Sequence, residues 1–376
     1  MKLLYISNIR IPTERAHGLQ VMKTCEAISN DGIDLELVVP DQKNKQDPFT
    51  YYGIKQVFKL RRVSVYNLLH FKKIGFIAQS FLFSFLVIFS LGSRLKTEII
   101  YSRDIFTLAI LILFGCKNVY FESHAGEYNF VVKYVLKRVR GIVCITHGLK
   151  NHYLALGVKE KKITIAPDGV DLKLFRSLPT RAECRGKLGL PLDKKIIMYV
   201  GSFFSYEWKG LDTFLETARK FGAEYIFCAV GGSESEIRDL ELRGVSSNVS
   251  LIERKPNIEI PFFLRAADVL VLPNKSGDII SEKFTSPMKL FEYLASGTPI
   301  VASRLESLKE VLHENNCLFF TPNDTDSLSS AITKIVDDQS LAAGLVLSAA
   351  TEAERYSWTN RARQIIQLLK KNESHH

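Results

Sequence analysis

The stretch TSPMKLFEYLASGTPIVA, residues 285–302, contains the strongest structural signal in the chain. Ser286 suits a helix N-cap, and Pro287 suits the first helical position, where its missing N–H costs nothing. An apolar, helix-length segment follows, and residues 298–302 then form a short apolar run that is typical of a buried strand. Helices that alternate with such strands build parallel α/β sheets, so this stretch indicates the fold class.

The same alternation extends in both directions from this stretch. In the first half we predict helices over 19–29 and 105–114 and strands over 2–7, 34–40, 98–102, 118–122 and 141–145. In the second half we predict strands over 195–200, 224–230, 250–253, 268–273, 298–302 and 317–321. Runs that are apolar on both faces and separated by helices predict parallel sheets covered on both sides.

The length and punctuation of the chain predict two domains. Its 376 residues exceed one ordinary domain, and 46% hydrophobic with 24% charged residues is ordinary globular usage. Pro and Gly residues cluster between 166 and 191, which places the boundary near residue 172. The expected fold is α/β, with doubly wound, Rossmann-like domains over 1–172 and 173–357 that face a central cleft. A final helix and tail, 358–376, can pack on either domain.

The net charge of +10 is confined to the first half. Residues 1–172 carry 24 Lys and Arg against 14 Asp and Glu, whereas residues 173–376 carry 26 of each. This asymmetry favours an anionic partner of the first half, although solubility charge is an alternative. Six isolated cysteines without a CxxC pair indicate neither a disulfide framework nor a zinc site, and they suit a reducing cytosol. The start MKLLYISNIR is too short in its apolar part for a signal peptide.

One segment of the first half competes with a purely soluble interpretation. Residues 74–92 contain no charged residue, and the wider stretch 48–97 carries eight Lys and Arg but no acid. The uncharged run has three interpretations: a buried core helix, a helix on a membrane surface, or a true span. The basic flanks favour contact with an anionic membrane, which Lys72 and Lys73 would support.

The beginning of the helix after Pro287 is a candidate anion site. Free N–H groups and the positive end of the helix dipole attract phosphate, and Lys289 would add a full charge in the first turn. Glu292 lies on the same helix face, one turn further along, where its carboxylate can accept two ribose hydroxyls. The alternative is a capped helix with an ordinary surface Lys–Glu pair.

A second candidate cation lies near another helix start. Lys209 precedes Gly210, after the strand 195–200. With Lys289 it could hold one diphosphate from two sides and stabilise the charge of a leaving group without a metal ion. An exposed lysine is the plain alternative.

Several motifs together resemble the retaining family-4 glycosyltransferases, which have the GT-B fold. They are SPMKLFEYLASGTPIVA (286–302), YVGS (199–202) with WKGLD (208–212), APDGVD (166–171), RAHGLQVM (15–22) and YSRD (101–104). They cover nearly the whole chain in the family's order. The resemblance implies that the second domain binds a nucleotide sugar, and that the first presents the acceptor.

The resemblance also implies residue roles. His124, at the end of the strand 118–122, resembles the active-site histidine, and neutral imidazole can donate to or accept from a hydroxyl. The residues implied in catalysis are His124, Lys209, Lys289 and Glu292. The donor-binding residues are Ser202, Lys209, Gly232 (beside Gly231), Arg254 (beside Lys255), Ser286, Pro287, Lys289, Leu290 and Glu292. The acceptor-side residues are His17, Gly18 and Arg103, and no metal ligand is implied.

Two departures from the family pattern leave the donor sugar open. Many members have a second glutamate where Phe284 stands here, and many have an arginine in place of Ser202. The resemblance implies that, in the branch with Ser-Pro-x-Lys, Lys289 and backbone amides take over the duties of these two residues.

The sequence therefore predicts a metal-independent retaining glycosyltransferase. Its co-substrate is a UDP- or GDP-linked sugar, and its acceptor is a glycan or lipid-linked hydroxyl in cell-surface glycan or glycolipid synthesis. No further cofactor and no nucleic acid is expected, because the basic residues are not interleaved with an aromatic platform. The expected location is the cytoplasm, with peripheral contact at the inner face of the plasma membrane. Two alternatives are a catalytically silent GT-B subunit that binds an anionic glycan or lipid, and a nucleotide-sugar epimerase.

Overall fold

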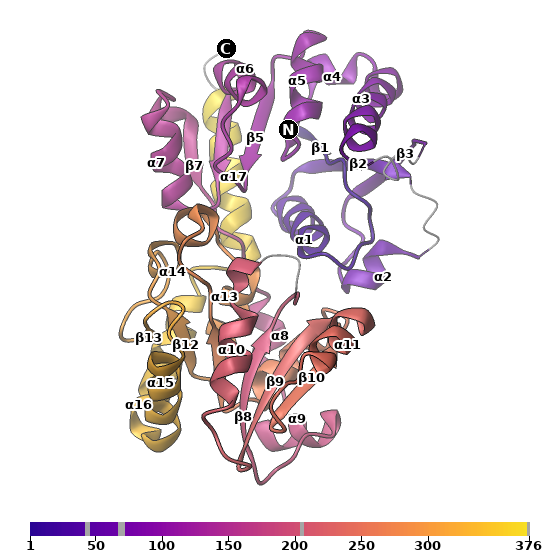
Figure 1. The fold of residues 1–376 in the computed structure, drawn as a ribbon. Helices are drawn as coiled ribbons and strands as arrows, with labels where there is room; N and C mark the ends of the chain where they lie inside the picture. Colours follow the sequence, from indigo (N-terminus) through magenta and orange to yellow (C-terminus); the bar gives the residue numbers. More distant parts are fainter. Residues whose placement is uncertain (42–45, 67–71, 204–206, 374–376) are drawn as a thin grey trace. The chain divides into compact units, whose positions relative to one another are not determined.

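The computed structural model describes residues 1–41, 46–66, 72–203 and 207–373. The chain divides into two compact units, the first made of Met1–Pro167 with Trp358–His376 and the second of Asp168–Ser357 (Figure 1). The division falls before residue 172 because the segment after Asp168 is tied to the second unit. The N–H of Val170 donates to the Tyr356 carbonyl at 2.8 Å.

The first unit is built on a seven-stranded parallel sheet, ordered β3-β2-β1-β4-β5-β6-β7. Its strands are β1 (Lys2–Ile6), β2 (Asp34–Asp41), β3 (Lys59–Ser64), β4 (Ile99–Ser102), β5 (Val119–Ser123), β6 (Gly141–Cys144) and β7 (Ile163–Ile165). Its helices are α1 (Ala16–Asn30), α2 (Pro48–Tyr52), α3 (Lys72–Leu91), α4 (Arg94–Thr97), α5 (Ile105–Leu113), α6 (Phe130–Arg138), α7 (His147–Ala155), α17 (Trp358–Glu373) and the short η2 (Glu160–Lys162). The sequence analysis did not predict β3 or β7.

The second unit has a six-stranded parallel sheet, ordered β10-β9-β8-β11-β12-β13. Its strands are β8 (Lys195–Val200), β9 (Tyr225–Gly232), β10 (Val249–Glu253), β11 (Val269–Leu272), β12 (Ile300–Ser303) and β13 (Leu318–Phe320). Its helices are α8 (Leu172–Arg176), α9 (Arg181–Leu188), α10 (Leu211–Ala218), α11 (Glu234–Leu242), α12 (Ile260–Ala266), α13 (Met288–Ala295), α14 (Glu306–Lys309), α15 (Thr325–Asp337) and α16 (Gln339–Ala353), with the short η3 (Glu207–Lys209) and η4 (Ile280–Phe284). The predicted α/β class with parallel sheets is confirmed.

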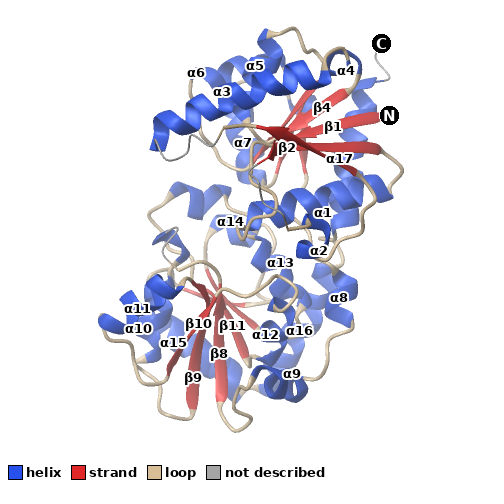
Figure 2. Ribbon diagram, turned by 90° about the vertical axis from the view of Figure 1, so that its right-hand side faces the viewer, coloured by secondary structure: helices blue, strands red, loops and turns tan. Residues whose placement is uncertain are grey.

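Strand β8 shows why both faces of this sheet are covered. Ile196 and Met198 pack into the core beneath α12 and α13, whereas Ile197 and Tyr199 pack into a second core beneath α10 and α15. Alternate residues of a strand point to opposite faces, so an all-apolar strand requires helices on both. Figure 2 shows this arrangement, with the strands between two layers of helices.

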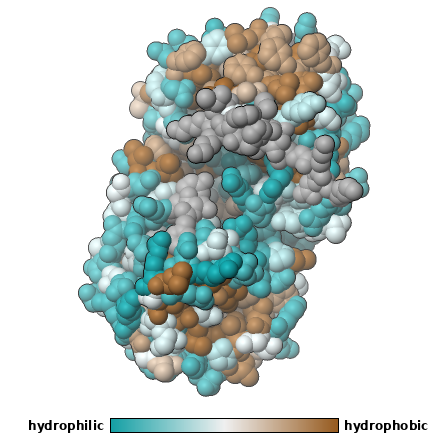
Figure 3. Space-filling model, turned by 45° about the vertical axis from the view of Figure 1, so that its right-hand side comes forward, coloured by the Kyte–Doolittle hydropathy of each residue, from teal (hydrophilic) through white to brown (hydrophobic). Residues whose placement is uncertain are grey.

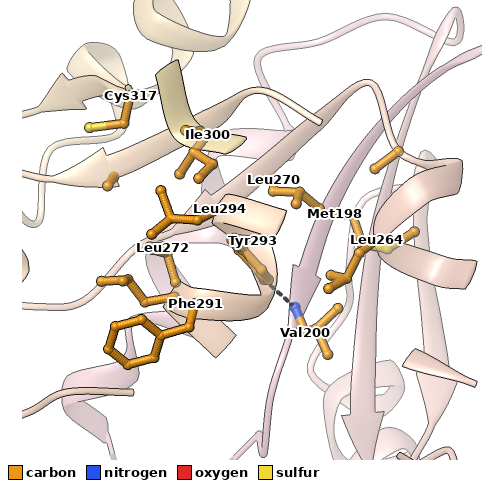
Figure 4. Packing of buried hydrophobic residues seen from close by; sticks show 14 of the residues in the cluster. Met198, Val200, Leu264, Leu270, Leu272, Phe291, Tyr293, Leu294, Ile300 and Cys317 are labelled. Atoms are coloured by element: carbon orange, nitrogen blue, oxygen red, sulfur yellow. Dashed lines mark hydrogen bonds between the residues drawn. The ribbon is translucent and has the colours of Figure 1, made fainter. Parts of the chain in front are cut away.

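Helix α13 is fixed to β8 by one buried hydrogen bond. The Val200 N–H donates to the Tyr293 hydroxyl at 3.0 Å (Figure 4). Tyr293, Phe291 and Leu294 are buried with Leu272 and Ile300 around this contact. The beginning of α13 is therefore held rigidly beside the carboxyl end of β8.

The sheet order locates the reversal point of each unit. β1 lies between β2 and β4, and β8 lies between β9 and β11. Crevices at the carboxyl ends of the strands that flank such a reversal are the usual ligand sites of doubly wound sheets. In this chain the segments concerned follow Ile6 and Ser102 in the first unit, and Val200 and Leu272 in the second.

Helix α3 covers the uncharged run, for which the sequence leaves three interpretations. One face is buried, with Phe83 and Val87 fully enclosed, while Phe81, Phe85 and Phe89 are exposed. Among the described residues, no helix has both the length and the apolar character needed to cross a membrane. The run is thus half core and half surface. The side chains of Lys72 and Lys73 lie outside the described residues.

Candidate functional site

The candidate site of the second unit surrounds the loop after β8. A Cβ atom on Gly201 would lie only 3.6 Å from the Lys289 Nζ, so the ammonium group approaches the backbone of this loop. It also lies 4.3 Å from the centre of the Tyr199 ring. The loop and the first turn of α13 therefore meet, as the sequence predicted for two anion-binding segments.

Lys289 is the most unusual side chain of this site. Its Nζ atom is buried and donates no hydrogen bond to any of the described residues. Burial, and secondarily the charge of Lys209, holds the pKa of Lys289 well below its usual range. A buried ammonium without an acceptor is costly, so the site is arranged for an anion that supplies one.

Lys209 is the second cation of the same site. Its Nζ donates to the Ser202 hydroxyl at 2.5 Å. Burial, with a smaller effect from Arg254, lowers the pKa of Lys209 to about 8. The electrostatic effects of Arg254 on Lys209, and of Lys209 on Lys289, show that the three predicted cations lie near one another.

Glycines bring these backbone segments together. Gly210 has φ +70°, and a Cβ atom there would lie 1.7 Å from the Pro273 carbonyl oxygen, so only glycine fits. A Cβ on Gly231 would lie 2.3 Å from the Gly201 carbonyl oxygen, and one on Gly232 would lie 2.5 Å from the Phe203 ring. The close approach expected of Gly232 is thus made to the chain's own loop after β8.

The helix start differs from the prediction in two respects. Helix α13 begins at Met288, so Pro287 occupies the N-cap position that Ser286 was expected to fill, and no side chain caps the helix. The reason is that the fixed φ of Pro287 allows it to end the preceding extended segment. The side chain of Leu290 is buried in the apolar core, so a contact with the donor would have to come from its backbone. Ser286 and Pro287 themselves are half-buried.

Glu292 lies one turn beyond Lys289 on α13 and is half-buried. Burial raises the pKa of its carboxyl to about 7. A carboxyl that is poorly solvated gains from donors supplied by a ligand, and sugar hydroxyls are such donors.

The first unit has a different polar centre around Glu122, at the carboxyl end of β5. This fully buried carboxylate accepts hydrogen bonds from the Tyr101 hydroxyl and from Gln20 Nε2 at 2.7 Å. It forms an ion pair with Arg361 of α17, with 2.7 Å between Nη2 and Oε1. Burial alone would raise the pKa of Glu122, but the charge of Arg361 and the bond to His124 hold it well below its usual range.

Three predicted residues converge on this centre. His124 Nε2 lies 2.5 Å from Glu122 Oε1, and Arg103 Nη1 donates to Gln20 Oε1 at 2.9 Å. Burial lowers the pKa of His17 to about 4, and the charges of Arg103 and of other neighbours, His124 among them, contribute. His17, Arg103 and His124 are thus brought together at one edge of the sheet.

Gly18 lies inside α1, where a Cβ atom would lie 2.2 Å from the Tyr52 hydroxyl oxygen. The absence of a side chain at this position therefore allows the close packing of Tyr52.

The sequence analysis missed Glu122, Gln20 and Arg361. The only available signal was a Glu two residues before His124, in the strand that ends just before this histidine.

An Asp-x-Asp sequence at Asp324 and Asp326 is accounted for by local structure. Asp324 caps α15, and Asp326 pairs with Lys220. Among the described residues, no group of three or more His, Cys, Asp or Glu side chains is placed to hold a metal ion.

Comparison with known proteins agrees with this architecture. Residues 194–338 match the family model described as Glycosyl transferases group 1. A D-inositol 3-phosphate glycosyltransferase of Thermobispora bispora is 27% identical over 226 residues, covering 55% of this chain and 50% of the relative. A phosphatidyl-myo-inositol mannosyltransferase of Mycolicibacterium smegmatis is 25% identical over 207 residues, covering 54% of this chain and 50% of the relative. The chain spans about half the length of the curated relatives that it matches.

Solved structures are similar over the whole chain. Sucrose-phosphate synthase from Thermosynechococcus elongatus has a TM-score of 0.77 at 19% identity, covering 100% of both chains. The Anabaena protein HepE, solved with UDP and glucose, has a TM-score of 0.78 at 14% identity, covering 98% of this chain and 99% of HepE. These likenesses show the fold. The fold is therefore GT-B, and residues 194–338 of the second unit are similar to the glycosyl transferases group 1 family.

Proposed function

We propose that this protein is a retaining glycosyltransferase that moves a sugar from a nucleoside diphosphate to an acceptor hydroxyl. One observation carries the proposal: Lys289 Nζ is buried with no acceptor among the residues that the structure describes, beside the loop after β8 and near a second cation, Lys209. A diphosphate supplies the missing acceptors, and its two charges match the two ammonium groups.

The same residues suit the chemistry of a departing diphosphate. As the bond between sugar and phosphate breaks, negative charge grows on the phosphate oxygens, and Lys289 and Lys209 stabilise it in place. The uncapped start of α13 adds N–H donors directed toward the same anion. Glu292 accepts the ribose hydroxyls, and Arg254 lies on the base side.

The first unit is proposed to hold the acceptor. Its charge asymmetry favours an anionic molecule, and two of the curated relatives are named for inositol-phosphate acceptors. His124, held by Glu122, would contact the donor sugar, while His17 and Arg103 contact the acceptor. We infer a retained configuration, with the acceptor hydroxyl on the face that the diphosphate leaves and the leaving phosphate taking its proton.

We also propose a cytoplasmic location, at the inner face of the plasma membrane. All six cysteines are free and buried, which suits a reducing compartment.

A thermal-shift screen against UDP, GDP, their sugars and inorganic diphosphate tests the proposal. One nucleoside diphosphate should raise the melting temperature of the protein, because a ligand that binds only the folded state stabilises it. The variant Lys289→Met should lose that shift, whereas the exposed Lys334→Met on α15 should retain it. No shift with any nucleotide, or an equal shift in Lys289→Met, would contradict the proposal.

A further inference from the structure

A stripe of apolar, mostly aromatic side chains lies on the outer face of α3. Ile77, Phe81, Phe85 and Phe89 are all exposed, and Phe89 is 81% accessible to solvent. They recur every four residues, so they form one line along the helix. At 1.5 Å per residue this line is about 18 Å long.

The opposite face of α3 is firmly attached to the first unit. Ser80 accepts a hydrogen bond from Asn8 Nδ2 at 3.0 Å, and the Ser84 hydroxyl lies 3.3 Å from that of Thr107 on α5. Phe83 and Val87 are completely buried between these polar contacts. The stripe is therefore presented on a fixed helix, and turning it inward would break this packing.

Helix α5 continues the stripe. Phe114, just after α5, packs edge-on against Phe85, with 5.4 Å between the ring centres. Leu113 beside it is 69% exposed. Figure 3 shows brown side chains gathered at the top of the molecule, the level at which α3 and α5 lie in Figure 1. Six apolar side chains thus form a continuous surface, which we name the α3–α5 patch.

Cations border this patch. Lys96 and Lys117 are exposed, and Lys96 lies close enough to Cys116 to lower the pKa of that thiol, which burial raises. Both lysines therefore lie beside the loop that carries Leu113 and Phe114. Residues 48–97 contain no acid in sequence.

Two other basic residues of the stretch 48–97 form ion pairs with acids of the first unit. Arg61 pairs with Glu36, and Arg94 pairs with Glu36 and Glu98. These two arginines therefore contribute less to a membrane contact than unpaired lysines would.

We propose that the α3–α5 patch docks on the surface of an anionic lipid bilayer, with α3 in the membrane plane. Aromatic side chains enter the boundary between headgroups and acyl chains, while Lys96 and Lys117 contact lipid phosphates. A second copy of the chain is a poorer occupant, because a symmetric contact would bring these like charges together.

The second unit offers a useful contrast within the same molecule. Among its described residues, the exposed large hydrophobic side chains are aliphatic, and most come from separate elements, such as Leu192, Leu242 and Leu347. Single apolar side chains of this kind are normal on soluble surfaces. They provide matched controls for the stripe.

Flotation with lipid vesicles tests the proposal, independently of any glycosyl transfer. The full chain should float with phosphatidylcholine vesicles that contain phosphatidylglycerol, and it should float less at high salt. Phe81→Ser with Phe89→Ser should weaken binding at least about tenfold, because both lose apolar contact with lipid. Leu347→Ser, 72% exposed on α16, should change nothing.

Charge variants complete the test. Lys96→Gln and Lys117→Gln should each weaken binding about fivefold, whereas Lys309→Gln on α14 should not. Absence of flotation at low salt would overturn the proposal. Vesicle binding by the stripe variant, Phe81→Ser with Phe89→Ser, that equals binding by the wild-type protein would overturn it as well. If the stripe variant fails to fold, Phe89→Ser alone must still reduce flotation. If the wild-type protein is a dimer without lipid and Phe89→Ser makes it monomeric, a second copy of the chain is the occupant. That result would also overturn the proposal.

Discussion

The two units treat buried charge in opposite ways. In the first unit, Glu122 is surrounded by an arginine, a histidine, a glutamine and a tyrosine. In the second, Lys289 Nζ is buried and has no acceptor within the described part of the chain, and its charged neighbour Lys209 is of the same sign. The two groups occupy corresponding places, each near the carboxyl end of a parallel sheet.

This difference separates structure from function. A buried charge with all its partners present contributes to a fixed native arrangement, and removing one partner is costly. A buried charge without partners destabilises the unliganded unit and gains when a ligand arrives. The contrast assigns Glu122 to positioning and Lys289 to binding.

The largest expected effect is on stability, through the polar centre around Glu122, where the buried carboxylate has all its partners. Arg361→Leu should lower the free energy of unfolding of the first unit by about 3–5 kcal/mol, because Glu122 would remain buried without its ion-pair partner. Urea unfolding of the variant and the wild-type protein measures this difference.

The matched control is Arg176→Leu. Arg176 pairs with Glu354 on the surface, and both side chains are exposed. Such a pair is worth less than about 1 kcal/mol. Equal effects of the two substitutions would contradict the distinction between the buried and the exposed pair.

His124 belongs to the polar centre around Glu122 and is also the residue proposed to contact the donor sugar. His124→Ala should reduce kcat by roughly 100-fold or more if the imidazole acts on the sugar in the transition state, while donor affinity changes little. The donor found by the ligand screen serves for both measurements. His313→Ala, in the second unit, is the control, and near-normal turnover in His124→Ala would make His124 a structural residue only.

Glu292 should make the stability of the folded protein depend on pH. Its pKa in the folded state is about 7, above the ordinary value of 4.5. Between these values the folded protein holds a proton that the unfolded chain has released, so stability falls as the pH rises from 4.5 toward 7. Glu292→Gln should flatten this part of the profile in thermal melts, and exposed Glu241→Gln should not.

Binding of a deoxynucleotide sharpens the assignment of Glu292. The wild-type protein should prefer the nucleoside diphosphate to its 2′-deoxy form, and Glu292→Gln should lose that preference. Equal discrimination by both proteins would exclude the 2′-hydroxyl as the partner of this carboxylate.

Lys209 should give the smallest effect. With a folded-state pKa of about 8, it is partly neutral in mildly alkaline solution. Affinity for the diphosphate should therefore weaken gradually as the pH rises above about 8. Titration calorimetry across that range measures it, and a flat profile would indicate that Lys209 does not contact the anion.

Local pattern was sufficient for much of the fold. The predicted bounds of β8 agree with the structure because an apolar run ends at a glycine there. β3 was missed because its Lys and Arg residues hide an edge strand, and α1 begins earlier than predicted because no side chain caps it. Such features depend on neighbours and not on the local sequence.

The candidate site was predicted unevenly for the same reason. Lys289 and Lys209 follow strand ends that the pattern shows, so their meeting could be expected. The contact between Arg361 and Glu122 joins segments that are 239 residues apart, so no local sequence pattern could predict it. Helix α3 similarly needed the structure to separate its buried face from its exposed one.

The affinity of Lys289→Met for the nucleoside diphosphate, set against that of the wild-type protein, tests the central claim most directly. The variant should melt at a higher temperature without ligand, because a buried unpaired cation has been removed. It should bind UDP or GDP about 10- to 150-fold more weakly, because a charge-assisted contact of roughly 1.5–3 kcal/mol is lost. Unchanged diphosphate affinity in a folded Lys289→Met protein would contradict the account.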